Sequence, residues 1–396
     1  MGLAASDPSP HARGSVVTKV TEDAFDDEFV RSNGLSWVRR TRCSAGWYFR
    51  SRAQASVNRQ DLGHRLRPGF DLPDTAVREY EDVRAEPGQI LHRDGLALPE
   101  TFRLFRLREV VNEKLEDLGP TVARTTYPDS AFTRLRGTYF YLDTEVPEIY
   151  GHLVTEVVSR LWAWDRALGD HPDLKALVFA PPGAHDVAPW FRETLRAYGI
   201  PDERIHVETG PVRVDRVVGA TPLFSNVGYA HPDLVAIWRR IKKGLFPSAT
   251  RRFEGVRAFV ARGAGYQRRC VNGDELEGRF RAAGYEVVYP ERLSLANQAT
   301  LFSNASVVAG YGGSGMLNMI YGSGGGRRLV ICSEGYNAVN EYQIASVLGD
   351  RIDYLYCPVW PEPIRDGWNR KYFNADFRFD FARDGGQLAD LLEATV

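Results

Sequence analysis

Residues 305–334 read ASVVAGYGGSGMLNMIYGSGGGRRLVICSE, and this stretch decides the fold. An apolar run ends in a glycine-rich turn, a short helical segment follows from Met316 to Tyr321, and a second apolar run ends at Glu334. This order predicts a strand, a turn, a helix and another strand. Glycines let the backbone approach a ligand closely, and the free N–H groups of a helix start attract phosphate. The stretch suits a nucleotide diphosphate, and a tight strand-to-helix corner is the alternative interpretation.

The same alternation of strand and helix extends on both sides of this stretch. It predicts an earlier set of elements at 148–168 (helix), 176–180 (strand), 187–198 (helix), 214–220 (strand) and 231–243 (helix). After a linker at 247–252, it predicts strands at 256–261, 285–289, 306–309, 328–332 and 352–357, with helices at 273–283, 295–303, 314–321, 338–348 and 385–394. Such alternation predicts parallel sheets covered by helices. The fold class is therefore α/β, with two Rossmann-like domains facing a cleft.

The domain boundaries follow from these patterns. We predict an N-terminal Rossmann-like domain at 75–246, which begins with short strands, and a C-terminal Rossmann-like domain at 253–365. Residues 1–74 are predicted to be an N-terminal extension that is partly disordered. Its arginine- and aromatic-rich part, 31–70, is expected to pack on the main body, with an anionic-ligand or partner surface as the alternative. Residues 366–396 are expected to cross back to the N-terminal domain.

Composition excludes several classes of function. The 396 residues carry a net charge of −1, so no global basic field points to nucleic acid. No apolar run approaches the roughly 20 residues of a membrane helix, and the first residues lack the apolar core of a signal peptide. The four cysteines, Cys43, Cys270, Cys332 and Cys357, form neither a CxxC pair nor a Cys/His cluster. We therefore expect a cytoplasmic protein without a metal site.

A first group of chemical residues lies at the start of the helix predicted over 148–168. His152 and Glu156 are four residues apart, as are Glu156 and Arg160, so all three share one helix face. Such a stripe can bind a sugar hydroxyl, take its proton and steady an anion. We predict that His152 and Glu156 are catalytic and that Tyr150 and Arg160 bind the acceptor. A solvated row of salt bridges is the alternative.

A second group follows the strand predicted at 256–261. Arg262 stands at the carboxyl end of this strand, where an open α/β sheet binds its ligands, and Arg268 and Arg269 lie in the next loop. The planar guanidinium suits bidentate phosphate binding, so we assign these arginines and Asn272 to the donor. The alternatives are solvated arginines and an Asn272 that caps the helix containing Glu275.

A third group belongs to the glycine loop of the opening stretch. Its predicted donor-binding residues are Gly312, Gly313, Ser314, Gly315, Asn318 and Glu334. Glu334 ends a predicted strand, so its carboxylate can accept hydrogen bonds from a ribose, and an ordinary loop carboxylate is the alternative. The sequence has no Asp-x-Asp triplet, no GxxxxGK[ST] and no GxSxG.

These three groups, in this order, resemble the glycosyltransferase 61 family. That family pairs a Gly-His-x-x-x-Glu helix with a strand ending in Arg, an Arg/Asn/Glu segment, a Gln-bearing helix and a GxHGAGxxN loop. The matching residues over about 135–335 are Gly151, His152, Glu156, Arg262, Arg268 or Arg269, Asn272, Glu275, Gln298, and Gly310 to Asn318. The loop departs from the pattern, because Gly312 replaces its histidine and Ser314 its alanine. If that histidine contacts the donor diphosphate, then Tyr311 or an arginine substitutes for it, the donor differs, or activity is reduced.

The resemblance implies a GT-B enzyme that moves a sugar from a nucleotide-sugar donor to an acceptor hydroxyl. It implies inversion at the anomeric carbon, with His152 or Glu156 as the base, and neither an obligatory metal nor a cofactor other than the nucleotide-sugar co-substrate. The expected acceptor is a polysaccharide, a glycolipid or a small molecule. The expected partners exclude nucleic acid, and a homodimer is left open. The alternatives are a nucleotide-sugar epimerase on the same scaffold and a non-catalytic nucleotide-binding protein, which the Gly312 departure keeps open.

Overall fold

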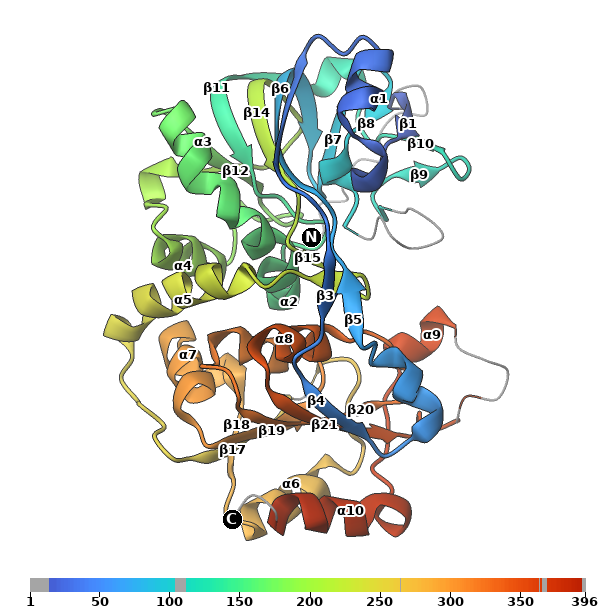
Figure 1. Cartoon of the computed structure of the whole chain (residues 1–396), viewed down its shortest axis with the longest axis vertical. Helices are drawn as coiled ribbons and strands as arrows, with labels where there is room; N and C mark the ends of the chain where they lie inside the picture. Colours follow the sequence, from blue (N-terminus) through green and yellow to red (C-terminus); the bar gives the residue numbers. More distant parts are fainter. Residues whose placement is uncertain (1–13, 104–111, 264, 363, 365–368, 394–396) are drawn as a thin grey trace, which may run out of the picture. The chain divides into compact units, whose positions relative to one another are not determined.

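A computed structural model describes residues 14–103, 112–263, 265–362, 364 and 369–393 of the chain. These residues form two compact units. The first comprises Met1–Trp47, Pro73–Arg192 and Ile200–Gly228, and the second comprises Tyr48–Leu72, Glu193–Gly199 and Tyr229–Val396. Sheets and helices occur in each (Figure 1), which confirms the α/β class. The start of the predicted extension, 1–13, and the predicted boundary at 365/366 lie outside the described residues.

The first unit contains a sheet in the order β13-β12-β11-β14-β6-β7-β8-β1-β10-β9, with β2 also paired to β6. Its strands are β1 (Val16–Lys19), β2 (Val38–Ser44), β6 (Thr75–Glu86), β7 (Ile90–Arg93), β8 (Leu96–Ala97), β9 (Glu116–Asp117), β10 (Val122–Arg124), β11 (Thr133–Tyr141), β12 (Lys175–Phe179), β13 (Ile205–Glu208) and β14 (Val212–Ala220); β15 (Phe224–Ser225) lies outside it. The pairs β13–β12, β12–β11 and β11–β14 are parallel, whereas β6 is antiparallel to β14. The predicted parallel strands thus form one end of a mixed sheet.

The helices of this unit include the predicted helix at 148–168, which is an unbroken run from Tyr150 to Asp170. It consists of α2 (Tyr150–His152), the π-helical η5 (Leu153–Val157), the 3₁₀-helical η6 (Val158–Ala163) and α3 (Trp164–Asp170). The other helices are η1 (Glu22–Ala24), α1 (Asp27–Ser32), η3 (Pro99–Thr101), η4 (Asp129–Ala131) and η7 (Asp202–Arg204), and α4 (Pro189–Tyr198) spans the division between the units. Short π-helical segments inside helices are frequent at functional sites.

A buried ion-pair network ties the first residues of the unit to its sheet. Arg78 on β6 is fully buried, and its guanidinium lies 2.5 Å from Glu22 and 2.8 Å from Glu100. The Tyr80 hydroxyl donates to Glu100, and the Thr221 hydroxyl donates to Glu22. The two carboxylates offset the charge of the buried guanidinium and accept its hydrogen bonds. A buried charge requires both.

The second unit contains a parallel sheet in the order β18-β17-β19-β20-β21-β4. Its strands are β4 (Gln54–Val57), β17 (Arg257–Val260), β18 (Glu286–Val288), β19 (Val307–Tyr311), β20 (Arg327–Ser333) and β21 (Arg351–Cys357), and β3 (Tyr48–Arg50), β5 (Gly69–Asp71) and β16 (Tyr229–Ala230) lie outside it. A parallel sheet is covered on both faces, so its strands are almost continuously apolar. Residues predicted as an extension therefore supply the edge strand β4.

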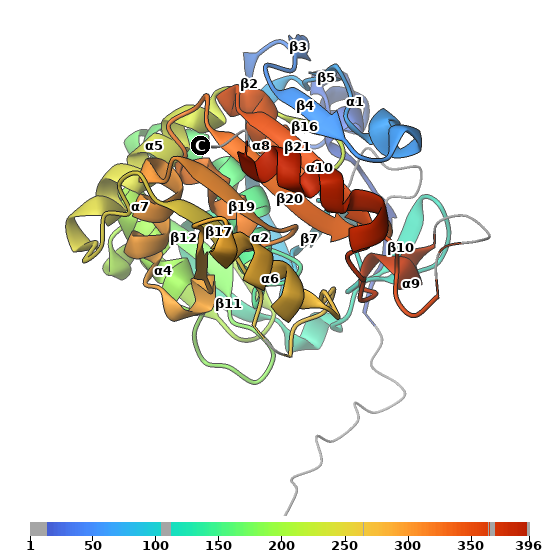
Figure 2. The same cartoon turned by 90° about the horizontal axis from the view of Figure 1, so that it is seen from below.

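Helices cover both faces of this sheet. Figures 1 and 2 show α6 (Gly273–Ala282) and α10 (Phe381–Glu393) on one face, and Figure 1 shows α7 (Leu295–Asn304) and α8 (Asn340–Leu348) on the other. The remaining helices of the unit are η2 (Gln60–Arg65), α5 (Leu234–Leu245), η8 (Phe246–Ser248), η9 (Pro290–Arg292), η10 (Met316–Tyr321) and α9 (Arg370–Phe373). In the described part of the chain, no helix has the length and apolar character needed to span a bilayer.

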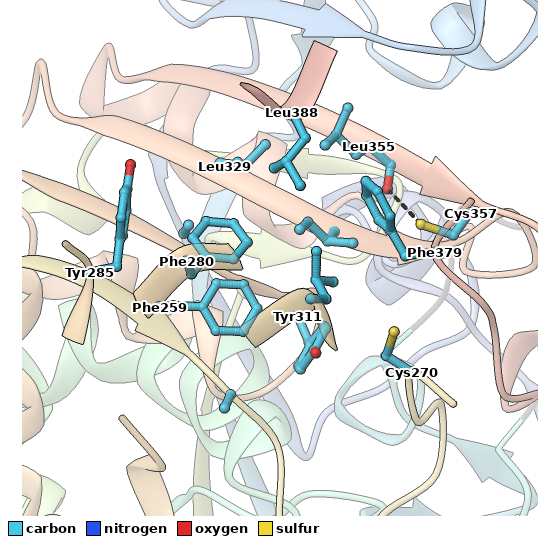
Figure 3. Close-up of a cluster of buried hydrophobic side chains, with 14 of the residues drawn as sticks. Phe259, Cys270, Phe280, Tyr285, Tyr311, Leu329, Leu355, Cys357, Phe379 and Leu388 are labelled. Atoms are coloured by element: carbon cyan, nitrogen blue, oxygen red, sulfur yellow. Dashed lines mark hydrogen bonds between the residues drawn. The ribbon is translucent and has the colours of Figure 1, made fainter. Parts of the chain in front are cut away.

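The core under α6 and α10 explains where the C-terminal segment lies. Phe280 of α6 and Leu388 of α10 meet the strand residues Phe259, Tyr311 and Leu355 in one buried cluster (Figure 3). The segment 366–396 was expected to cross back to the N-terminal domain, but α10 packs on the sheet of the second unit because its apolar side completes this cluster.

We predict that Arg78→Leu lowers the free energy of unfolding of the first unit by about 3–5 kcal/mol, because it leaves two buried carboxylates without their counter-ion. The matched control is Arg39→Leu on β2, whose side chain is 71% exposed and lies 3.5 Å from Glu79. That exposed pair contributes at most about 1 kcal/mol. Urea denaturation followed by fluorescence measures both variants, and equal losses of stability would contradict the account.

Candidate active site

The order of the strands singles out one position in each sheet. In the first unit, β11 has β12 and β13 on one side and β14 on the other. In the second unit, β17 and β18 lie on one side of β19, and β20 and β21 on the other. Ligands of open α/β sheets bind outside the carboxyl ends of the strands where the order reverses. The residues that follow β11, β14, β17 and β19 are thus the first place to look for a site.

In the first unit, the helix residues predicted to be catalytic meet the end of β11. His152 Nδ1 lies 2.6 Å from Glu156 Oε1, and the other carboxylate oxygen accepts a hydrogen bond of 2.6 Å from the Thr144 hydroxyl. Arg103 Nε lies 3.8 Å from Glu156 Oε1 and donates to Glu145 at 2.6 Å. The carboxylate holds Nδ1 of the imidazole, whose side chain is 21% exposed, and so leaves Nε2 for a ligand.

The electrostatics assign different roles to His152 and Glu156. Burial by itself raises the pKa of Glu156, but the neighbouring His152, Arg103 and the Thr144 hydroxyl lower that pKa to about 2. A carboxylate with so low a pKa stays ionised and is a poor base at neutral pH. The Glu156 carboxylate is therefore suited to fix the orientation of the imidazole through its contact with Nδ1. Nearby, burial raises the pKa of Asp143 to about 7, although backbone amides of Gln89 and Phe179 donate to its carboxylate.

A cavity of about 10 Å³ adjoins Glu156, lined by Arg103, Thr155, Glu156, Arg160, Pro222, Phe224 and Asn226. A volume of this size is close to the minimum for one water molecule. Arg160 is buried, donates from Nη1 to the carbonyl of Asp143 at 3.2 Å, and has no partner for Nε among the described residues. The Arg160 side chain therefore belongs to the buried lining of this cavity. Tyr150, at the helix start, places its ring edge-on to Trp190 at 5.6 Å.

In the second unit, Arg262 links the ends of β17 and β19. Its Nη2 donates to the carbonyl of Gly312 at 2.6 Å, and its Nη1 donates to the carbonyls of Gln267 and Arg268. Burial, and then the positive charge of Arg268, lower the pKa of Arg262 to about 10. Because a buried guanidinium lies beside a second one, an anion placed between them would be stabilised.

Arg268 reaches the same point from the next loop. Its backbone adopts φ 59°, and its guanidinium lies 4.8 Å from the ring of Tyr336 and 5.1 Å from that of Phe373. A Cβ placed on Gly313 would lie 2.9 Å from Nη2 of Arg262 and 3.1 Å from Nη2 of Arg268. Two guanidinium groups thus converge on Gly313, whose φ of +130° also requires glycine.

The loop itself is held by a buried acid. Glu341 on α8 is fully buried, and its carboxylate accepts the Gly313 N–H at 2.6 Å and the Tyr336 hydroxyl at 3.2 Å. Burial raises the pKa of Glu341, against the opposing effects of these donors and of Arg268. The next two amides, of Ser314 and Gly315, have no hydrogen-bond partner among the described residues. The loop therefore presents two free N–H groups beside two arginines.

The packing around Gly312 explains the departure from the family loop. A Cβ at this position would lie 3.0 Å from Cβ of Cys332 and 3.2 Å from the ring of Tyr336. Tyr336 thus occupies the space that a side chain at 312 would need. Tyr311 does not replace the missing histidine, because its ring packs edge-on to Phe259 in the core (Figure 3). Of the residues proposed to substitute for the histidine, Arg262 and Arg268 are therefore the ones whose side chains lie beside the loop.

Other predicted donor residues are tied elsewhere. Arg269 pairs with Asp376, and the Asn272 amide bonds the backbone of Phe379. Asn272 occupies the N-cap position of α6, but its side chain makes no capping bond. Asn318 is buried and donates to Gln298 at 2.8 Å and to the carbonyl of Gly315 at 3.1 Å, so it supports the loop from within. The Glu334 carboxylate is bound by Arg59 and Arg383.

Sequence reasoning missed several residues of these two sites, namely Arg103, Thr144, Glu145, Tyr336, Glu341 and Phe373. One signal was available: Asp143-Thr144-Glu145 is a polar run directly after a predicted strand. The others are brought in by distant segments, which no local pattern reports. The predicted helix start after Gly315 is a six-residue 3₁₀-helix, η10, and Met316 N–H bonds the Gly313 carbonyl. Within the described ranges, no three His, Cys, Asp or Glu side chains gather as a metal site.

We predict that the stability contributed by Glu156 depends on pH. Its pKa of about 2 lies below the usual 4.5, so the contribution is full above pH 4.5 and is lost as the pH falls toward 2. The loss corresponds to roughly 3 kcal/mol. The difference in unfolding free energy between the wild type and Glu156→Gln should therefore narrow between pH 5 and pH 3 in urea titrations. A difference that stays constant over that range would show that the carboxylate is not held by these partners.

We also predict that Gly312 does not tolerate a side chain. Gly312→Ala should cost about 1–3 kcal/mol of stability through overpacking, and Gly312→His should cost more. Gly278→Ala is the control, since a Cβ on that helical glycine meets no atom within 4 Å and alanine favours the helix by up to about 1 kcal/mol. Thermal unfolding compares the three variants. Wild-type stability in Gly312→His would mean that Tyr336 does not fill this space.

Comparison with known proteins agrees with the order of these groups. The family model described as Glycosyltransferase 61 matches residues 150–330, a segment that contains His152, Glu156, Arg262, Arg268 and the glycine loop. A search of curated proteins finds no significant match. The resemblance predicted from the motifs is thereby confirmed, because this segment of the chain matches the glycosyltransferase 61 family model.

Proposed function

We propose that the protein is an inverting glycosyltransferase that moves a sugar from a nucleotide-diphosphate donor to the hydroxyl of a carbohydrate or glycoconjugate acceptor. One observation carries this proposal: Arg262 and Arg268 converge on Gly313 at the position where the strand order of a parallel sheet reverses. We infer that the two units correspond to the acceptor and donor halves of a GT-B enzyme. The match of residues 150–330 to the glycosyltransferase 61 family model supports the transferase activity.

The donor diphosphate is proposed to bind the loop of the second unit. The unpartnered N–H groups of Ser314 and Gly315 supply neutral donors, and the guanidinium of Arg268 supplies a charged one. Arg262 keeps the Gly312 carbonyl turned toward itself and adds its charge. Fixed donors aimed at a leaving group stabilise the charge that develops on it. Because arginines provide this charge, we propose that transfer needs no divalent metal.

The acceptor is proposed to be activated by His152. Its Nε2 takes the proton of the acceptor hydroxyl as the oxygen forms a bond to the anomeric carbon of the donor sugar. The bond between that carbon and the diphosphate oxygen breaks at the same time, and the nucleoside diphosphate leaves with the electron pair. The Glu156 carboxylate at Nδ1 holds the tautomer and stabilises the imidazolium that forms. Direct displacement inverts the anomeric configuration.

The first test separates His152 from Glu156. The donor is identified beforehand by a thermal-shift panel of UDP, GDP, CDP, ADP and TDP, with and without EDTA. We expect His152→Ala to lower kcat by about 10²–10⁴-fold, as for loss of a general base, with donor binding unchanged. Glu156→Gln should also lower kcat and shift the pH–rate profile, because the amide no longer stabilises the imidazolium. Transfer at the wild-type rate in both variants would refute the proposed base, and donor binding without any transfer in the wild type would indicate a non-catalytic protein.

The second test compares adjacent arginines. Arg268→Gln should weaken binding of the nucleoside diphosphate by about 10–100-fold, as expected for a charge-assisted hydrogen bond. Arg269→Gln is the matched control, because that side chain is 62% exposed and is paired with Asp376. Isothermal titration measures both variants against the nucleotide found in the panel. If the two variants bind equally well, the loop beside Gly313 is not the diphosphate site.

A further inference from the structure

A second concentration of positive charge lies at the end of α5, apart from the glycine loop. The last turns of α5 and the following segment enclose an open hollow of about 540 Å³, lined by Arg239, Lys242, Lys243, Phe246, Pro247 and Arg252. Four of these six residues are cationic, and none is acidic. The hollow belongs entirely to the second unit.

The four cations of this hollow have no counter-ion in the part of the chain that the structure describes. Among the described residues, none of Arg239, Lys242, Lys243 and Arg252 makes an ion pair. Neighbouring basic residues do: Arg251 pairs with Glu286 at 2.5 Å. A basic residue next to the hollow thus finds an acidic partner, whereas the four that line it have none among the described residues.

The surroundings of Lys242 in the hollow disfavour its charged form. The residue is half-buried, and burial, followed by the charge of Arg239, lowers its pKa. Its ammonium lies 3.4 Å from the Ser303 hydroxyl and 5.9 Å from the centre of the Phe246 ring. A hydroxyl and an aromatic face do not neutralise a cation, so an anion in the hollow would relieve both the burial and the repulsion.

Helix capping explains only part of the pattern. Lys242 and Lys243 stand in the last turn of α5, where cations favour the negative end of the helix dipole. Arg239 belongs to the preceding turn, three and four residues before these lysines, so like charges share one face at a small cost. Arg252 arrives from beyond Pro247 and gains nothing from the dipole. The helix dipole therefore does not explain why cations from α5 and from the segment after Pro247 line the same hollow.

We propose that this hollow is a binding site for a phosphate-bearing ligand, separate from the proposed donor site. The two guanidinium groups suit the bidentate geometry of a phosphomonoester or diphosphate, and the ammonium groups add point charges. Phe246 and Pro247 provide an apolar ledge for the organic part of the ligand. The phosphate belongs either to a free phosphorylated compound or to a lipid headgroup, and these two sources share the chemistry that the hollow recognises.

The test uses inorganic pyrophosphate as the probe in isothermal titration of the full chain at low salt, and every protein carries Arg268→Gln to weaken the proposed donor site. We expect the chain with Arg268→Gln alone to bind pyrophosphate, and the chain that also carries Lys242→Gln/Lys243→Gln to bind it at least tenfold more weakly. The matched control is Arg279→Gln/Arg281→Gln, which removes two cations from the last turn of α6 and should bind as the chain with Arg268→Gln alone does. Equal binding by both double variants would overturn the proposal.

A second arm identifies the source of the phosphate. Flotation with phosphatidylcholine vesicles, with and without phosphatidylglycerol, compares the same three proteins. Binding to the anionic vesicles that disappears in Lys242→Gln/Lys243→Gln assigns the site to a lipid headgroup. Pyrophosphate binding without vesicle binding assigns it to a free phosphorylated ligand, and neither form of binding overturns the proposal. Nucleoside diphosphate binding should be unchanged in Lys242→Gln/Lys243→Gln, so failure here is distinguishable from failure of the donor site.

Discussion

The hydrogen bond from the Gly313 N–H to the buried carboxylate of Glu341 is the contact on which the proposed donor site depends. It holds the glycine in a backbone conformation that other residues rarely adopt, next to two amides that have no partner among the described residues. The same carboxylate accepts the hydroxyl of Tyr336, whose ring supports the guanidinium of Arg268. One buried acid thus positions the backbone donors and one of the charged donors together. It also accounts for Gly312, because Tyr336 fills the space beside it.

The first unit also has a buried acid at its proposed site, but there the surroundings favour the ionised carboxylate. There the buried acid is Glu156, and its partners keep it ionised, whereas burial raises the pKa of Glu341. In the proposed mechanism, an ionised carboxylate at Nδ1 of His152 prepares the imidazole to receive a proton at Nε2. The other hydrogen bond to Glu156 comes from Thr144, shortly after β11, and a positive charge comes from Arg103, in the segment before residue 104. Each unit therefore uses a buried acid to fix groups that would otherwise be mobile.

Much of this architecture was predictable, because apolar strands, glycine turns and helical periods are local signals. The strands at 256–261 and 306–309, the helix at 273–283 and the positions of His152 and Arg262 follow from such signals. What could not be predicted depends on contacts between distant segments. Tyr336 and Phe373 reach Arg268 only through the folded chain, and β4 joins β21 although 293 residues lie between Val57 and Arg351. Arg269 and Asn272 fit the motif by spacing, yet Asp376 and Phe379 hold them elsewhere.

The most direct test of the account is amide hydrogen exchange of the glycine loop, with and without the nucleoside diphosphate that stabilises the protein. The N–H groups of Ser314 and Gly315 have no partner among the described residues, so they should exchange rapidly in the free protein. Bound diphosphate should slow their exchange, and Arg268→Gln should reduce that protection. Protection confined to another part of the chain, with rapid exchange retained at these two amides, would contradict the placement of the donor phosphates beside Gly313.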